Sequence, residues 1–125
     1  QLHRRQRQMC IRDSFNIIAK QWIHNELDLS HKGFESYDSF RQRVSKAVEK
    51  ASSIMKKNSN TMVVSSGGAI TGVYAECHPL TVEEIMDLNF KIKNASLTLF
   101  KKENETFTLE SFNRSLLPSY LETFI

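Results

Sequence analysis

The clearest pattern of hydrophobic and polar positions lies between residues 36 and 57, where apolar side chains recur at gaps of three and four. This spacing predicts a long amphipathic helix with one apolar face. Ser36 is suited to cap its start, and Lys56 and Lys57 suit the negative end of the helix dipole. Asn58 is a residue type that commonly ends a helix. We therefore predict a helix from Ser36 to about Lys57.

A shorter apolar stretch, Phe15–Ile23, precedes this helix and predicts a short helix of its own. We expect its largest apolar side chains, Ile17, Ile18 and Trp22, to face inward. The polar residues 25–33 between the two helices predict a loop.

The residues Thr61–Ser65 form an apolar, β-branched run that predicts a strand buried on both faces, as in the centre of a parallel sheet. The following residues, Ala69–Glu76, predict a helix that leaves this strand. A helix, a strand and a helix with short connections are typical of an α/β layer fold.

The downstream region predicts another helix and then a hairpin. Thr81 and Glu84 have the spacing of a capping box for a short helix that runs through Leu88. The alternating runs 95–101 and 106–112 predict two antiparallel strands joined by a turn. With so few strands, the chain is expected to contain part of a sheet.

Length and charge limit the function classes. The 125 residues fit one domain, and their net charge of +3 is carried entirely by residues 1–14, which leaves the remainder neutral. No basic stripe with interleaved aromatic residues follows, so nucleic-acid binding by residues 15–125 is not expected. Residues 1–14 closely resemble a translated sequencing-adapter read-through, and we interpret them as a non-native leader. The alternative is a basic arm that binds nucleic acid or membrane.

Two cysteines, Cys10 and Cys77, do not make a disulfide framework, and no apolar run is long enough to span a membrane. No secretion signal is recognisable, so a cytoplasmic protein is expected. Cys77 is interpreted as a small buried apolar residue and His78, beside Pro79, as a helix terminator. No spacing of ligand residues indicates a metal site, and no cofactor is expected.

The candidate chemistry lies in the stretch Val63–Ile70, where an apolar run meets two serines and two glycines before a helix start. Backbone N–H groups at such a turn, together with the helix dipole, favour an anion and most often a phosphate. A tight turn without any ligand needs the same glycines, so both interpretations stay open. Ser66 does not fit a G-x-S-x-G nucleophile elbow, because Val64 stands at its first glycine position.

Four segments in order resemble the histidine phosphatase (phosphoglycerate mutase-like) superfamily between Phe34 and Asn113. They correspond to its E-S-x-x-x-F-x-x-R-V, V-V-S-H-G-G-V-I, L-N…N-x-S and S-F-N patterns: Glu35–Phe40 with Arg43-Val44, Val63–Ile70, Leu88-Asn89 with Asn94–Ser96, and Ser111–Asn113. The resemblance implies a three-layer α/β/α sandwich that hydrolyses phosphomonoesters through a phosphohistidine.

Two departures from this family shape the expected function. The R-H-G motif of the nucleophile is missing, since His31-Lys32-Gly33 lacks the arginine and a preceding strand. Ser66 stands where the family has its second histidine, and a serine cannot carry positive charge. We therefore expect residues 15–125 to be the C-terminal part of a sandwich, inactive alone, in which Ser66, Gly67 and Gly68 contact a phosphoryl group.

A non-catalytic module of the same fold, binding a phosphorylated ligand or a protein, is the alternative function. A small phosphorylated substrate is the expected partner in the first case, with neither nucleic acid nor membrane involved. An incomplete sandwich exposes a sheet edge and an apolar face, so self-association is expected in solution.

Overall fold

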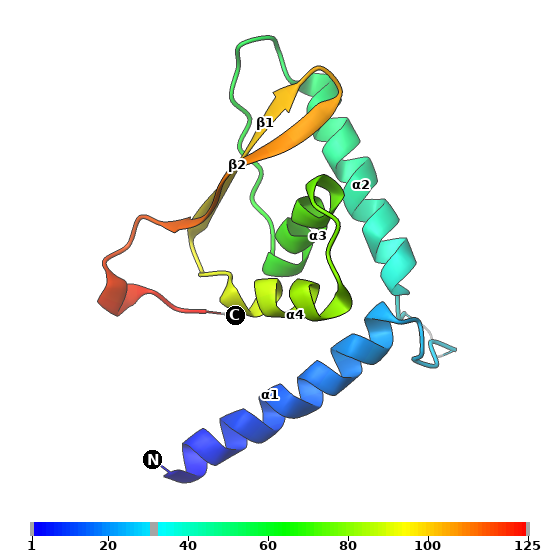
Figure 1. The fold of residues 1–125 in the computed structure, drawn as a ribbon, viewed down its shortest axis with the longest axis vertical. Coiled ribbons are helices and arrows are strands. Elements are labelled where there is room, and N and C mark those ends of the chain that lie inside the picture. Colours follow the sequence, from blue (N-terminus) through cyan, green and yellow to red (C-terminus); the bar gives the residue numbers. More distant parts are fainter. Residues whose placement is uncertain (1, 31–32, 125) are drawn as a thin grey trace. The chain divides into compact units, whose positions relative to one another are not determined.

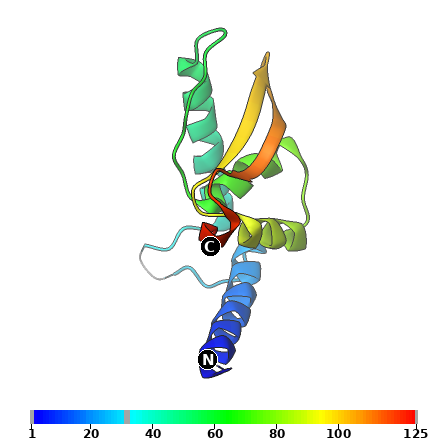
Figure 2. The same cartoon turned by 90° about the vertical axis from the view of Figure 1, so that its left-hand side faces the viewer.

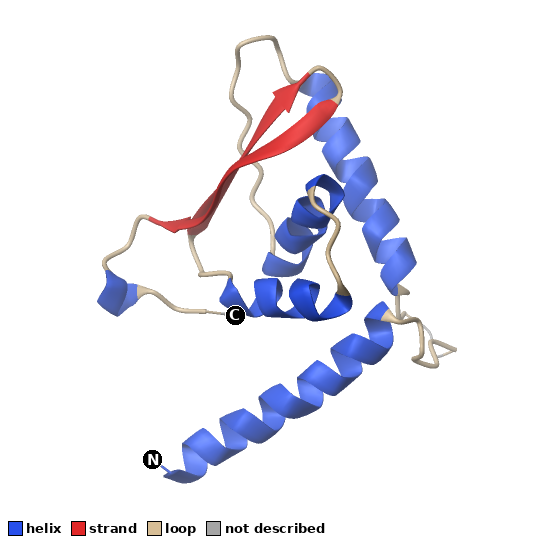
Figure 3. Ribbon diagram, in the orientation of Figure 1, coloured by secondary structure: helices blue, strands red, loops and turns tan. Residues whose placement is uncertain are grey.

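The computed structural model describes residues 2–30 and 33–124, which divide into two compact units, Gln1–Gln42 and Arg43–Ile125 (Figure 1). The described part of the first unit is helical, and the second unit combines helices with one antiparallel hairpin, so the fold is of the α/β class (Figure 3). The elements, in chain order, are α1 Leu2–Ile23, α2 Tyr37–Ile54, α3 Gly67–Cys77, α4 Val82–Lys91, β1 Ser96–Glu103, β2 Thr106–Ser115 and the 3-10 helix η1 Ser119–Leu121. Among the described residues, no helix is long and apolar enough to cross a membrane.

Helix α1 is longer than the predicted helix over 15–23, because it begins at Leu2. Its first half is rich in arginine and glutamine, which have high helix propensity. The prediction that Ile17 and Ile18 face inward is wrong, since they are 60% and 54% exposed. The interpretation of residues 1–14 as a non-native leader stays a prediction.

The first unit is held by aromatic contacts at the end of α1. The Trp22 ring lies 5.2 Å from Tyr37 and 5.4 Å from Phe40, both in the first turn of α2. Its indole Nε1 donates a hydrogen bond of 2.7 Å to the backbone carbonyl of Glu35. The end of α1 near Trp22 therefore packs, whereas Ile17 and Ile18, one turn earlier, stay exposed.

Helix α2 starts as predicted, because the Ser36 hydroxyl accepts a hydrogen bond of 3.1 Å from the Ser39 N–H. It ends at Ile54, three residues before the predicted end, and Asn58 adopts a left-handed conformation with φ of 60°. Val44 on α2 is 5% exposed and belongs to the small core of the second unit. A Cβ added to Gly72 of α3 would lie 3.2 Å from Val44 Cγ1, so α2 and α3 approach closely at this point.

The predicted capping box at the start of α4 is confirmed. The Thr81 hydroxyl accepts a 3.2 Å hydrogen bond from the Glu84 N–H, and the Glu84 carboxylate accepts a 2.8 Å bond from the Thr81 N–H. The helix continues to Lys91, three residues beyond the predicted end. It contributes Met86, and the residue after it, Ile92, to the core, at 6% and 3% exposure.

The predicted hairpin is also confirmed. Strands β1 and β2 pair in antiparallel register, with Phe100 opposite Leu109, around a tight turn in which Asn104 has a φ of 57°. Alternate side chains of β1 are half-buried, as are those of β2 up to Glu110, after which residues 111–113 are all half-buried. The ring of Phe112 on β2 meets Tyr74 of α3 edge-on at 5.3 Å. The hairpin thus covers α3 on one side (Figure 2).

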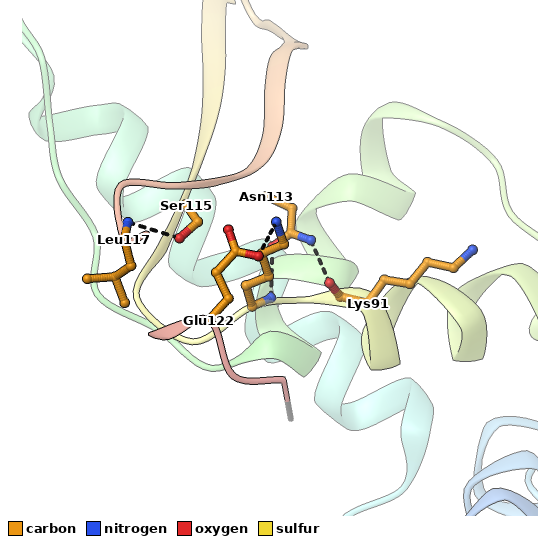
Figure 4. Close-up of polar contacts among 6 residues, drawn as sticks. Lys91, Asn113, Ser115, Leu117 and Glu122 are labelled. Carbon is orange, nitrogen blue, oxygen red and sulfur yellow. Dashed lines mark hydrogen bonds and ion pairs between the residues drawn. The ribbon is translucent and has the colours of Figure 1, made fainter. Parts of the chain in front are cut away.

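Asn113 joins the end of α4 to β2 from a left-handed position with φ of 55° (Figure 4). Its side-chain oxygen accepts a 2.8 Å hydrogen bond from the Lys93 N–H, and its amide nitrogen donates to the Lys91 carbonyl. The Lys93 ammonium pairs with Glu122 at 2.9 Å, which attaches the C-terminal segment to the same point. The S-F-N segment therefore has a structural role here: its phenylalanine packs and its asparagine links two elements.

The predicted central strand Thr61–Ser65 is wrong: these residues form an extended loop between α2 and α3 (Figure 1). Met62, Val63 and Val64 are 80%, 67% and 92% exposed. A strand needs a neighbour for its N–H and C=O groups, whereas the sheet in the described residues consists of β1 and β2 paired with each other. The apolar sequence is strand-like, but nothing in the structure pairs with it.

Candidate functional site

The three residues predicted to contact phosphate lie together at the start of α3. Ser66 is the N-cap residue with φ of −92° and ψ of 162°, and its carbonyl accepts a 3.0 Å hydrogen bond from the Ile70 N–H. Its side chain is exposed and makes no capping hydrogen bond. The hydroxyl therefore stands at the helix start without occupying the N–H groups of the first turn.

The backbone of the first turn is suited to an anion. In any α-helix the first N–H groups, here those of Gly67, Gly68 and Ala69, have no partner within the helix and face its N-terminal end. No acidic side chain lies in the first turn of α3 to compete for them, and the helix dipole adds partial positive charge. The electrostatics of this site thus come from backbone groups.

The two glycines are not required by backbone conformation, since Gly33 is the described glycine with a positive φ. Gly67 is buried and Gly68 half-buried, both inside the first helical turn. Because neither glycine has a side chain, the start of the helix backbone is not covered by side chains at these two positions.

Thr71 is a residue of this site that the sequence reasoning missed. Its side chain is 2% exposed, and its hydroxyl donates a 3.0 Å hydrogen bond to the Gly67 carbonyl. This bond fixes the first turn of α3 from inside the helix. The signal in the sequence was a threonine four positions after Gly67, in the apolar first half of the helix.

Cys77 and His78, the other residues singled out in this region, lie at the C-terminal end of α3. Cys77 is the last of the 11 residues of α3, so it lies roughly 16 Å from Ser66 along the helix at the usual rise per residue. Burial, followed by the nearby Glu76 carboxylate, raises the pKa of the Cys77 thiol, so this group stays protonated. His78 is exposed, and its backbone N–H bonds the Tyr74 carbonyl at 2.9 Å, which agrees with the interpretation of a helix terminator.

The His31-Lys32-Gly33 segment cannot be compared with the missing motif, because His31 and Lys32 lie outside the described residues. Gly33 lies in an exposed loop with φ of 96°. Within residues 2–30 and 33–124, no group of three His, Cys, Asp or Glu side chains is placed to hold a metal ion.

The sequence model of the histidine phosphatase superfamily (branch 1) matches residues 5–115. The chain therefore belongs to the histidine phosphatase superfamily, which confirms the resemblance drawn from the four segments. No curated protein and no solved structure matches the chain. The family match covers the uncapped start of α3, the α4 helix and the hairpin.

Proposed function

We propose that this chain forms one wall of the phosphoryl site of a phosphohydrolase that acts on phosphomonoesters through a phosphohistidine. The observation that supports this most directly is the start of α3: an exposed Ser66 hydroxyl, uncapped N–H groups and no acidic residue in the first turn. Membership of the histidine phosphatase superfamily supplies the reaction class.

In this proposal the first-turn N–H groups and the Ser66 hydroxyl donate hydrogen bonds to oxygens of the phosphoryl group. Phosphoryl transfer depends mainly on positioning and on stabilising the charge that spreads over these oxygens. A serine supplies a neutral hydrogen bond, and charge-assisted bonds are roughly twice as strong. The wall is therefore weaker than one with a histidine at position 66.

The nucleophile would come from an R-H-G segment, which the 125 residues do not contain. Within the same proposal, residues 15–125 are the C-terminal part of a three-layer α/β/α sandwich. Two observations support this. The run Met62–Val64 is apolar, strand-like in sequence and exposed, and the sheet in the described residues has only two strands. Both fit an incomplete sheet that further strands would extend. The chain alone is then inactive as an enzyme.

A second candidate is a non-catalytic module that binds phosphorylated ligands or a protein. It is favoured by Ser66 standing in the position of a histidine, together with the missing R-H-G motif. Recovery of the upstream reading frame distinguishes the two candidates. An R-H-G motif there favours the enzyme, and a complete reading frame without one favours the binding module.

The test shared by both candidates is a titration of the chain with inorganic phosphate, followed by amide chemical shifts. We expect the shifts of Gly67, Gly68 and Ala69 to move, with a dissociation constant in the millimolar range. Ser66→Ala should weaken binding a few-fold, and Ser66→His should strengthen it below the pKa of the imidazole. If phosphate moves none of these three amides, the proposed phosphoryl site is wrong, and of the second candidate only a protein-binding module is left.

Activity is measured with 4-nitrophenyl phosphate, a generic phosphomonoester. We expect no turnover by this chain above the uncatalysed rate, because the nucleophile is absent. Turnover that disappears with Ser66→Ala would contradict the proposal that the nucleophile comes from a segment outside these 125 residues.

A further inference from the structure

Thr71 has a buried hydroxyl that bonds to the first turn of α3, at a position where a valine would have nearly the same shape. Its side chain is 2% exposed, and Oγ1 donates a hydrogen bond of 3.0 Å to the Gly67 carbonyl. In an α-helix this carbonyl also accepts the N–H of the residue four positions later, which is again Thr71. The Gly67 carbonyl is therefore held by two hydrogen bonds from one residue.

The carbonyl that Thr71 holds belongs to the same peptide group as the Gly68 N–H. A peptide group is planar, with its C=O and N–H on opposite sides, so a carbonyl fixed toward the C-terminal end of the helix fixes the N–H toward the N-terminal end. That N–H is one of the first-turn donors that have no partner within the helix. The bonds from Thr71 therefore set the direction in which the Gly68 N–H points.

This peptide group is more easily rotated than one between residues with side chains. It joins Gly67 to Gly68, and neither residue has a Cβ to resist the rotation. On the N-terminal side, Ser66 makes no side-chain capping bond to the turn. A hydrogen bond to the carbonyl also polarises the peptide group, which strengthens the donor at its other end. The Thr71 hydroxyl thus acts on both the direction and the strength of the Gly68 N–H.

We propose that Thr71 is a positioning residue of the phosphoryl site, which aims the Gly68 N–H at an oxygen of the bound phosphoryl group through the Gly67 carbonyl. The inference rests on the proposed function, because it needs a phosphoryl group at the start of α3. Thr71 is buried and its hydroxyl already donates to Gly67, so it acts without touching that group. A donor that is already aimed needs no reorganisation when charge develops on the phosphoryl oxygens.

A purely structural role for the hydroxyl predicts a different result. Threonine hydroxyls in helices commonly bond to the carbonyl four residues earlier, and a buried hydroxyl needs such a bond. In that case Thr71→Val should leave both stability and phosphate binding unchanged, because the hydroxyl and its need for a partner disappear together. Thr71→Ser should be the more harmful variant, because it loses a buried methyl group. The two variants therefore separate stability from phosphate binding.

The test is a titration of the wild-type chain, Thr71→Val and Thr71→Ser with inorganic phosphate, followed by the amide shifts of Gly67, Gly68 and Ala69. We expect Thr71→Val to keep the wild-type Tm and to bind phosphate roughly threefold to tenfold more weakly, with the largest loss of phosphate-induced shift at Gly68. Thr71→Ser should lower the Tm yet bind phosphate within about twofold of wild type. If Thr71→Val binds like wild type, or Thr71→Ser binds as weakly as Thr71→Val, the inference is wrong.

A second measurement on the free protein needs no ligand. Without the hydroxyl bond the Gly68 N–H should become more mobile, which lowers its order parameter from amide nitrogen relaxation in Thr71→Val. Thr71→Ser should keep the wild-type order parameter at Gly68. An order parameter that Thr71→Val leaves unchanged would contradict the claim that the hydroxyl holds this peptide group.

Val73→Thr is the matched control, because it exchanges the same two residue types on the same helix. A hydroxyl at position 73 would bond to the Ala69 carbonyl, whose peptide N–H is that of Ile70 and is already bonded to the Ser66 carbonyl. Phosphate binding should therefore stay at the wild-type level. If Val73→Thr weakens it as much as Thr71→Val, the effect is a general disturbance of α3 and the inference is wrong.

The same titration distinguishes failure of this inference from failure of the proposed function. If phosphate moves none of the three amides in the wild-type chain, the phosphoryl site is wrong and the role of Thr71 falls with it. If the wild-type chain binds phosphate at these amides and Thr71→Val binds it equally well, the phosphoryl site stands and only the role of Thr71 is wrong.

Discussion

The segment Thr61–Ser65 and the strand Ser96–Glu103 are both apolar and β-branched or aromatic in part, yet only the second is a strand. In β1, alternate side chains are half-buried, and Phe100 lies opposite Leu109. In the first segment Val64 is 92% exposed and the backbone runs as a loop.

Only β1 forms a strand because its pairing partner is close to it along the sequence. The partner of β1 begins three residues after it ends, so closing the hairpin costs little loop entropy. A central parallel strand needs neighbours from separate parts of a fold, reached through crossover connections. Strand propensity is therefore sufficient for the hairpin and insufficient for Thr61–Ser65.

The largest effect is expected where the hairpin is attached to α4. Asn113→Ala removes the hydrogen bonds to Lys93 and Lys91 and places an alanine at a φ of 55°. We expect a loss of about 3 kcal/mol in the free energy of unfolding, measured by urea denaturation. Asn113→Gly loses the same bonds but tolerates the backbone, so it should lose about 1 kcal/mol less; equal losses would contradict a role for the backbone conformation.

The next effect concerns the helices that hold both ends of the extended loop. Gly72→Val should cost about 2 kcal/mol, because a Cβ at this position already lies 3.2 Å from Val44 Cγ1. The measurement is the same denaturation curve. Val44→Ala in the same chain should recover part of the loss; additive losses in the double variant would show that α2 and α3 do not meet at this point.

A smaller effect is expected at the start of α4. Thr81→Ala removes the hydrogen bond to the Glu84 N–H and should cost about 1 kcal/mol, seen as a lower Tm. Glu84→Gln, which keeps a side-chain acceptor for the Thr81 N–H, should cost less. A Tm that Thr81→Ala leaves unchanged would mean that the capping box does not stabilise the fold.

The smallest effect is expected in the extended loop itself. Val64→Thr should change the free energy of unfolding by less than about 0.5 kcal/mol at concentrations where the chain is monomeric, because the side chain is already 92% exposed. Phe100→Ala, in the paired strand, is the matched comparison and should cost clearly more. A large loss for Val64→Thr in the monomer would mean that the loop packs against the unit.

Local signals allowed much of the fold to be predicted. The Ser36 cap, the Thr81–Glu84 capping box and the hairpin turn at Asn104 each depend on residues a few positions apart, and all three are present. Helix α3 was also predicted, although it begins at Gly67, two residues before the predicted Ala69. Ser66, Gly67 and Gly68 lie together because they are consecutive. Thr71 was missed, since its role depends on the burial of its hydroxyl.

The sequence by itself determined the local elements and the family, because capping, turns and helical periodicity act within about one turn of the chain. The tertiary structure decided which apolar residues are buried. Ile17, Ile18 and Val64 are as hydrophobic as Val44 or Ile92, but only the last two have a neighbouring element against them. Burial requires a partner surface, and no residue carries that information alone.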